Sequence, residues 1–378
     1  MRVGILTHYN VASHGAYLQL YAMCRVLQQM GHTPIVMTYK KNFDFMSDEE
    51  SKKFQVRLRS VPYYLKEYLL KSGVSNVVFQ IRKHNELKKF GSIHFAYAPY
   101  ALETFDAVII GSDEVMSLQC GINLMMYGHG VRARKVLTYA PSFGQTDMKR
   151  IDEFRMRELI ASGLNSIDGL SARDAHTKAL IENLTGKTVP IVCDPALLYS
   201  FDEEKQFAIN PPINAPYILV YAYSSNLNEE RVVDAIQCYA HKKGCKTVSL
   251  EGYHKWCDKN ISCDPVAMLS WFAHATAVVT DTFHGTISSI ITHAPLALFQ
   301  RESNTVKMNY LVKQLGIEAA QIEAAEQLEH VLVEPLNYNA IEGRLLELRA
   351  AGMRYLEDQL TSIPDTLFVS ADGSTFSD

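Results

Sequence analysis

The sequence predicts an α/β protein built from two Rossmann-like domains that face each other across a cleft. Strand-like and helix-like segments alternate in both halves of the chain, and a stretch rich in Pro and Asn at 208–216 interrupts the pattern. The 378 residues also exceed the size at which one hydrophobic core usually stops growing. We therefore expect an N-terminal domain at 1–207, a C-terminal domain at 208–335, and a helix that packs back before a flexible tail at 336–378.

The first half has the rhythm of an open parallel sheet. A strand at 2–6, a helix at 15–30 that Gly31 closes and a strand at 33–38 form a first βαβ unit. Small or polar residues follow the later strands, which puts candidate site loops at the carboxyl edge of the sheet. These strands are expected at 106–110, 135–139, 166–171 and 190–193, and the loops at 111–114, 141–144, 172–174 and 194–195.

Residues 42–104 break this rhythm. Lys, Arg, Tyr and Phe are interleaved there over two helical stretches with few Gly or Pro. We expect a helical insertion over the sheet whose outer face is solvated or docks on a membrane or a partner. Nucleic acid is the less favoured ligand for this insertion, because the whole chain is mildly acidic.

The second half repeats the α/β pattern on a smaller scale. A long helix is expected at 336–360, and the last residues, 371–378, are expected to be disordered. The strands of this half are expected at 217–223, 247–250, 277–280 and 296–299.

Composition and charge limit the classes of function. The formal net charge is -4, which gives no bulk attraction to nucleic acid or anionic lipid. The N-terminus lacks the apolar core of a signal peptide and no run is long enough for a membrane span, so we expect a cytoplasmic protein. Its seven cysteines are an odd number, and we expect free thiols instead of a disulfide framework. Cys238, His241 and Cys245 have helical spacing, but without a C-x-x-C pair we predict no metal.

The segment VVTDTFHGTISS, at 278–289, is the most informative stretch of the chain. It predicts a buried strand that runs into a helix, for which Asp281 or Thr282 would be the N-cap. His284 and the backbone amides of Gly285 and Thr286 would then face an anion such as phosphate at the helix N-terminus. The alternative is a core histidine that a neighbouring carbonyl satisfies.

Six motifs occur in order along the chain and together resemble the polysaccharide pyruvyl transferase family. The similarity extends over roughly residues 4–317. The motifs are HGAYLQLYA at 14–22, GSDEV at 111–115, YAPSFG at 139–144, SARD at 171–174, CDPALL at 193–198 and TDTFHGTISS at 280–289.

This resemblance implies two domains arranged as in GT-B glycosyltransferases and a specific reaction. The pyruvyl group of phosphoenolpyruvate moves onto two hydroxyls of a glycan or lipid-linked sugar, which gives a cyclic ketal and free phosphate. Phosphoenolpyruvate is the donor substrate, and no other cofactor is implied. The first domain would carry the acceptor and the second the donor.

The resemblance also implies the site residues. Arg173 would bind an anion of the donor, His284 would transfer a proton or contact the phosphate, and Asp113 would act as a base or as a partner for sugar hydroxyls. The alternatives are a salt bridge for Arg173, a helix cap for Asp113 and loop packing for His14. Ser142 and Asp194 are interpreted first as residues that shape their loops, Asp194 through a turn before Pro195. The substrate-binding residues would be His14, Gly15, Ser112, Ser142, Phe143, Gly285, Thr286, Arg301 and Lys307.

The chain departs from the family pattern at three positions. Met116 and Ser117 replace a Trp and an Asn that usually follow the Gly-Ser-Asp segment, and this would alter one wall of the site. Lys307 stands where an Arg is common; a lysine holds phosphate as a point charge without the bidentate fork.

Two other functions are compatible with the same architecture. A glycosyltransferase would use a nucleotide sugar as donor, but the sequence gives no clear acidic pair at the strand ends of the second half to hold a ribose. A non-catalytic member would bind a phosphorylated ligand or a partner through 42–104.

Overall fold

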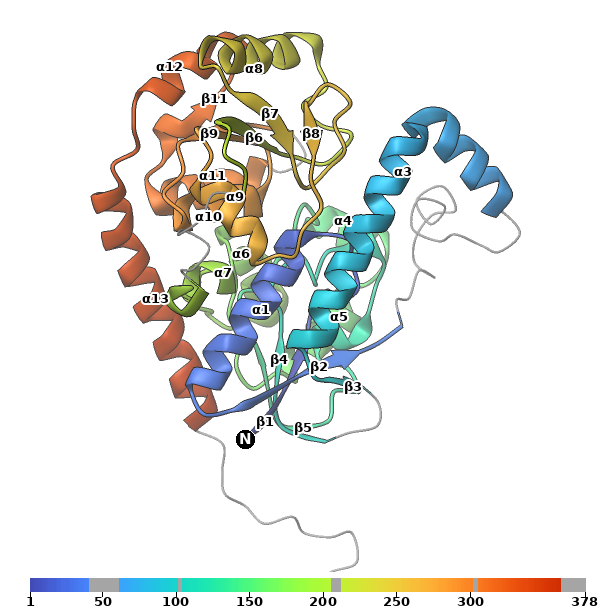
Figure 1. The fold of residues 1–378 in the computed structure, drawn as a ribbon. Coiled ribbons are helices and arrows are strands. Elements are labelled where there is room, and N and C mark those ends of the chain that lie inside the picture. Colours follow the sequence, from blue (N-terminus) through green and yellow to red (C-terminus); the bar gives the residue numbers. More distant parts are fainter. Residues whose placement is uncertain (41–60, 101–103, 205–211, 302–304, 362–378) are drawn as a thin grey trace, which may run out of the picture.

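The computed structural model describes residues 1–40, 61–100, 104–204, 212–301 and 305–361. Two parallel β-sheets with flanking helices form two halves, which lie one above the other in Figure 1. The expected α/β class with two Rossmann-like domains is confirmed. The expected boundary at 208–216 lies partly outside the described residues, and the tail at 371–378 lies wholly outside them.

The first sheet has five strands in the order β3-β2-β1-β4-β5. Its central strands are almost entirely buried and apolar, as expected for parallel strands that helices cover on both faces. Ile5 of β1 pairs with Val36 of β2 and with Ile109 of β4, so the carboxyl ends of these strands meet at one edge. The strands are β1 (Arg2–Leu6), β2 (Thr33–Thr38), β3 (Tyr97–Pro99), β4 (Phe105–Ile110) and β5 (Ala133–Thr138).

Two of the strands expected in this half are reduced to single bridges. Gly169 and Ile191 each form one isolated parallel bridge where strands at 166–171 and 190–193 were expected. Side-chain hydroxyls add to the few backbone hydrogen bonds there: Ser171 Oγ donates to Thr138 O at 2.8 Å, and the Ser171 amide donates to Thr138 Oγ1 at 2.7 Å.

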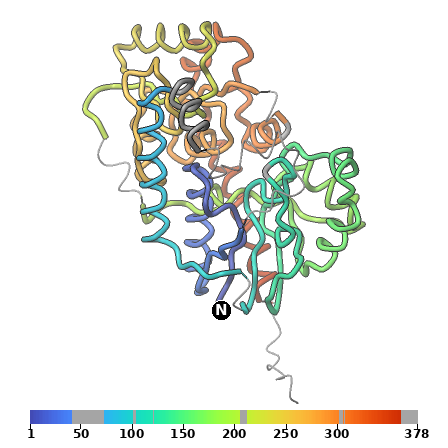
Figure 2. The backbone as a smooth tube through the Cα atoms, turned by 90° about the vertical axis from the view of Figure 1, so that its right-hand side faces the viewer, coloured from blue at the N-terminus to red at the C-terminus, as the bar shows by residue number. Residues whose placement is uncertain are grey.

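The insertion consists mainly of one long helix, α3 (Val61–His94), which Gly73 kinks with a φ of 74°. Residues 41–60 lie outside the described part of the chain. The helix lies beside α1 (His14–Gln29) in both views (Figures 1 and 2). The rings of Tyr21 on α1 and Phe90 on α3 are 5.5 Å apart. The insertion then ends in strand β3, an edge strand that the sequence pattern did not predict. The remaining helices of this half are α4 (Met148–Glu153), α5 (Arg157–Asn165), α6 (Ala175–Thr185) and α7 (Pro195–Leu198).

The second sheet has six strands in the order β11-β10-β9-β6-β7-β8. Strands β6 and β9 are neighbours although the chain leaves them toward opposite edges, so the strand order reverses between them. Such a switch point opens a crevice at the carboxyl ends of the strands. The strands are β6 (Tyr217–Tyr221), β7 (Lys246–Ser249), β8 (Lys259–Asn260), β9 (Ala277–Thr280), β10 (Leu296–Phe299) and β11 (Gln321–Ile322). The helices are α8 (Glu230–Lys242), α9 (Ala267–Ala273), α10 (Phe283–Ile291), α11 (Thr305–Leu315) and α12 (Leu328–Val333).

Helix α13 (Tyr338–Thr361) runs along both halves, at the left of Figure 1. Near its start, the Tyr338 hydroxyl donates to Ala294 O of the second half at 2.7 Å. Further along, Tyr355 Oη donates to Thr138 O of the first half at 2.9 Å. The helix therefore holds the two halves together. No helix within the described ranges is long and apolar enough to cross a membrane.

The buried face of α13 gives a direct test of this contact. Leu356 is 0% exposed, so Leu356→Ala should lower the free energy of unfolding by about 2–5 kcal/mol, because it removes apolar contacts and leaves a cavity. Leu346 on the same helix is 64% exposed, and Leu346→Ala should change it by less than about 0.5 kcal/mol. Urea unfolding followed by circular dichroism measures both; equal losses would show that α13 is not docked through this face.

Candidate active site

A cavity of about 230 Å³ lies between the two halves, at the carboxyl ends of strands from both sheets. Ligands of open α/β sheets bind at this edge. Five of the residues expected in the site line the cavity, and they come from both halves: Asp113, Arg173, His284, Arg301 and Lys307.

Arg173 is the central cation of this cavity and is only 4% exposed. Its Nη1 donates to Asp194 Oδ2 at 3.2 Å and to Asp113 Oδ1 at 3.4 Å, and its guanidinium carbon lies 4.4 Å from the centre of the Phe283 ring. Its Nε and Nη2 are buried and have no hydrogen-bond partner among the described residues. These two N–H groups form one edge of the guanidinium, which matches two oxygens of a carboxylate or phosphate.

The charges around Arg173 stabilise one another. Burial alone would raise the pKa of Asp113, but the charges of Arg173 and His284 outweigh burial and hold this pKa well below its usual range. The pKa of Asp194 is lowered against the effect of burial by His284 and Arg173. In turn, burial works against the charge of Arg173, but the two carboxylates raise its pKa. Both carboxylates are therefore ionised at neutral pH.

The loop after β4 brings Asp113 to the cavity in an uncommon backbone conformation. Asp113 has a φ of 74°, in the left-handed region that costs most residues energy. Gly111 has a φ of 116°, and a Cβ atom there would lie 2.3 Å from Tyr139 O. Only glycine fits at 111, which lets the loop turn sharply and present the Asp113 carboxylate.

His284 lies in the first turn of α10 and reaches across to the first half. Its ring packs against Gly15, where a Cβ atom would lie 2.4 Å from His284 Nδ1. Its Nε2 is buried, has no hydrogen-bond partner among the described residues, and lies 3.7 Å from Asp194 Oδ2. Gly15 is thus needed for close approach of this histidine, and Asp194 is the charged neighbour of its Nε2.

The backbone amides of Gly285 and Thr286 are not free to bind an anion, although this was expected of them. Thr282 is the N-cap of α10, and its Oγ1 accepts the Gly285 amide at 3.0 Å. The Thr286 amide donates to Thr282 O at 3.1 Å. Since the cap and the first helical bond already satisfy both N–H groups, the expected anion contact through them is wrong for this geometry.

His14 also differs from the expected sugar contact. It is 0% exposed, with Nδ1 2.6 Å from Glu251 Oε2 and Nε2 2.9 Å from Cys263 O. Both ring nitrogens are therefore occupied by protein oxygens, which leaves none for a sugar.

Three further residues hold loops together instead of facing the cavity, contrary to the expectation of substrate contact. Ser112 and Ser142 are 0% exposed and donate through Oγ to Asp194 Oδ2 at 3.1 Å and to Asp174 Oδ2 at 2.8 Å. Phe143 is 0% exposed and packs in the core of the first half. Their side chains have no free polar edge toward the cavity.

The departures from the family pattern have different consequences. Met116 is 0% exposed in the core of the first half, and Ser117 is 3% exposed, so neither forms the cavity wall expected of them. Lys307 does line the cavity, and its ammonium forms an ion pair with Glu114 of the first half. The cation expected at this position therefore also bridges the two halves.

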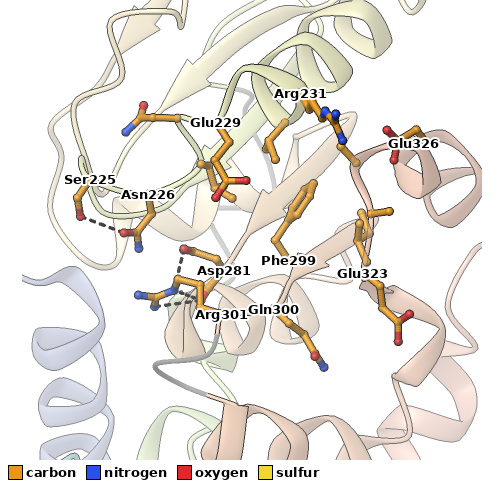
Figure 3. Close-up of a pocket in the computed structure, with 16 residues that line it drawn as sticks. Ser225, Asn226, Glu229, Arg231, Asp281, Phe299, Gln300, Arg301, Glu323 and Glu326 are labelled. Atoms are coloured by element: carbon orange, nitrogen blue, oxygen red, sulfur yellow. Dashed lines mark hydrogen bonds and ion pairs between the residues drawn. The ribbon is translucent and has the colours of Figure 1, made fainter.

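Arg301 separates the cavity from a second one in the second half. Its Nε lies 2.8 Å from Asp281 Oδ2, and it lines both cavities. Figure 3 shows the second cavity, of about 650 Å³, with Glu323 and Glu326 on its wall beyond β11. The expectation that no acidic pair lies at these strand ends is therefore wrong; the pair follows β11, a two-residue strand that the sequence pattern missed.

Sequence reasoning gave Asp194 only a loop-shaping role and did not identify Glu251. Asp194 precedes Pro195 and could be explained as a turn residue, although it also accepts from Ala196 N at 3.0 Å as the cap of α7. Its position after an apolar segment, like that of Asp113, was the signal available. No sequence signal pointed to Glu251, because its partners are distant in sequence.

The described residues contain no group of three His, Cys, Asp or Glu side chains that could hold a metal ion. The cysteines with described side chains are free thiols: Cys24, Cys193, Cys238, Cys245, Cys257 and Cys263.

Comparison with solved structures finds similarity over most of the chain at low identity. UDP-GlcNAc 2-epimerase from Methanocaldococcus jannaschii, in complex with UDP-GlcNAc and UDP, has 12% identity and a TM-score of 0.48, with 93% of this chain and 100% of that chain covered. The glycosyltransferase SnogD from Streptomyces nogalater has 13% identity and a TM-score of 0.40, with 96% of each chain covered. Comparison with curated proteins gives no match.

A family model gives the decisive comparison. The model described as polysaccharide pyruvyl transferase matches residues 14–303, which include the cavity residues from Asp113 to Arg301 and most of the chain. This protein belongs to the polysaccharide pyruvyl transferase family.

Proposed function

We propose that this protein is a cytoplasmic transferase that moves the pyruvyl group of phosphoenolpyruvate onto two hydroxyls of a glycan or lipid-linked sugar. The observation that carries the proposal is that two side chains lining the cavity between the halves have buried polar atoms without a hydrogen-bond partner. Arg173 offers Nε and Nη2, and His284 offers Nε2, with no hydrogen-bond partner for any of them among the described residues. Buried polar groups without partners are rare unless a ligand satisfies them.

The donor matches this arrangement chemically. Phosphoenolpyruvate carries a carboxylate and a phosphate on three carbons, so it needs donors for two anions. We assign one anion to the Nε and Nη2 edge of Arg173 and the other to the two cavity cations of the second half, Arg301 and Lys307. The small volume of about 230 Å³ suits a three-carbon donor and the reacting part of a sugar.

We assign the proton transfers to His284 and charge stabilisation to Asp113. His284 donates a proton to the methylene carbon, which becomes a methyl group and leaves positive charge on the central carbon. The first sugar hydroxyl attacks this carbon and returns its proton to His284. Phosphate then leaves with the electrons of its C–O bond, the second hydroxyl closes the ketal, and its proton leaves with the phosphate.

Asp113 fits stabilisation better than base catalysis. A carboxylate whose pKa lies well below the usual range is a weak base, because neighbouring charges favour its ionised form. Its fixed negative charge next to the central carbon would stabilise the cationic stage, and its oxygens can accept hydrogen bonds from the sugar hydroxyls.

One observation favours a second candidate function. The cavity of about 650 Å³ lies at the switch point of the second sheet and has Glu323 and Glu326 on its wall, where carboxylates could hold the hydroxyls of a ribose. A glycosyltransferase that uses a nucleotide sugar would bind its donor there.

Ligand-dependent stability distinguishes the two candidates. Phosphoenolpyruvate at about 100 times its dissociation constant should add about 2.7 kcal/mol to the free energy of unfolding, because it binds only the folded protein. Thermal unfolding with phosphoenolpyruvate, UDP-sugars and CMP-sugars measures this. Stabilisation by a UDP-sugar with none by phosphoenolpyruvate would reject the pyruvyl transfer and support the second candidate.

Replacement of Arg173 tests the anion contact. Arg173→Lys keeps the charge between Asp113 and Asp194 but removes the planar edge, so phosphoenolpyruvate should bind at least about tenfold more weakly. Calorimetry measures the affinity, and Arg157→Lys, at an exposed ion pair with Asp152, is the control that should bind normally. Unchanged affinity of a folded Arg173→Lys protein would remove Arg173 from the donor site.

Replacement of His284 tests the proton transfer. His284→Gln should reduce phosphate release by about 100-fold or more while phosphoenolpyruvate still binds, because glutamine cannot transfer the proton. Phosphate release from phosphoenolpyruvate with a panel of mono- and disaccharides measures the reaction. His241→Gln, on the exposed end of α8, should release phosphate at the normal rate; full turnover of His284→Gln would contradict the assignment.

A further inference from the structure

A cluster of buried charges lies at the edge of the cavity, which Glu251 lines, and is not used by the proposed chemistry. Lys83 of α3 and Glu251 after β7 are each 2% exposed, and His14 at the start of α1 is 0% exposed. Three segments of the chain therefore place charged or polar groups at one point: the first half, its helical insertion and the second half.

Glu251 connects the members of this cluster. Its Oε1 accepts from Lys83 Nζ at 2.7 Å, and its Oε2 lies 2.6 Å from His14 Nδ1 and accepts from Tyr221 Oη at 3.2 Å. The same ammonium donates to Glu251 O at 2.7 Å. Lys83 and His14 outweigh the effect of burial and lower the pKa of Glu251 to about 2, so the carboxylate is ionised at neutral pH.

Stability alone does not explain these charges. A buried ion pair loses most of its attraction to the cost of removing both ions from water, and apolar residues of similar size often stabilise a core equally well. Buried polar groups can instead select one arrangement of the chain over its alternatives. The geometry that this cluster fixes is the first turn of α1, because Glu251 also accepts the His14 backbone amide at 3.3 Å.

The first turn of α1 supports the imidazole of His284. Gly15 follows His14 directly, and a Cβ atom on Gly15 would lie 2.4 Å from His284 Cγ and Nδ1. The ring therefore lies directly on this backbone. Displacement of the turn would move the ring, and with it the Nε2 atom that lies 3.7 Å from Asp194 Oδ2.

We propose that Glu251 and Lys83 are positioning residues for His284: they hold His14, and thereby Gly15, in the place that orients the imidazole toward the cavity. The part of this proposal that concerns turnover rests on the proposed function; the part that concerns the position of the ring does not. Neither residue transfers a proton. They act through the first turn of α1.

The position of the ring can be observed without any substrate. In protein labelled with ¹³C,¹⁵N-histidine, the ring signals of His284 are identified by their loss in His284→Gln. Glu251→Gln and Lys83→Met should shift these signals, and Gly15→Ala, which displaces the ring directly, should shift them too. Lys83→Arg keeps the charge and should restore the normal signals. Lys88→Met, at an exposed position of the same helix, is the control that should leave them unchanged.

Turnover gives the second readout. Glu251→Gln and Lys83→Met should reduce phosphate release about tenfold to 100-fold, with a change of less than about threefold in the KM for phosphoenolpyruvate, because a small displacement of a reacting group affects the chemical step most. If the two residues served stability alone, their replacement would lower the unfolding temperature but would not reduce kcat at a nearly constant KM.

The outcomes are distinguishable. Folded Glu251→Gln with unchanged His284 signals overturns the proposal; where this variant does not fold, folded Lys83→Met with unchanged His284 signals overturns it. Absence of phosphate release from the unaltered protein would instead reject the proposed reaction, and the His284 signals would still decide the positioning.

Discussion

The buried guanidinium of Arg173 is the group on which the geometry of this site depends. It is 4% exposed, and a cation so far from water is stable only beside negative charge. Asp113 and Asp194 supply this charge through a single nitrogen of Arg173, at 3.4 and 3.2 Å. The left-handed backbone of Asp113 and the Asp-Pro start of α7 both follow from the need to bring these carboxylates together. The Nε and Nη2 groups at the opposite edge of the guanidinium have no hydrogen-bond partner among the described residues.

The site belongs to neither half alone. His284 comes from the second half but packs on Gly15 of the first half. The ring of Phe283 and the guanidinium of Arg173 also contact each other across the boundary between the halves. The ion pair between Lys307 and Glu114 crosses the same boundary. Helix α13 contacts both halves and limits their separation (Figure 1). Charge pairing and helix docking thus fix the cavity as a single arrangement in which polar groups from both halves face one ligand.

The sequence predicted the sheets better than the contacts of the site. Apolar strands such as 277–280 are evident from local pattern, because a buried parallel strand is apolar throughout its length. The amide of Gly285 was misjudged, since only the structure shows that Thr282 already caps it. Glu251 was missed, because its partners Lys83 and His14 are 168 and 237 residues away. Motif order identified the family, while side-chain pairing depended on tertiary structure.

A crystal structure of the protein with phosphoenolpyruvate would show whether Arg173 and His284 bind the donor. We expect the donor in the cavity of about 230 Å³, with one of its anionic groups on Nε and Nη2 of Arg173 and its methylene carbon next to His284 Nε2. Donor bound instead in the cavity beside Glu323, with the edge of Arg173 still unoccupied, would contradict it.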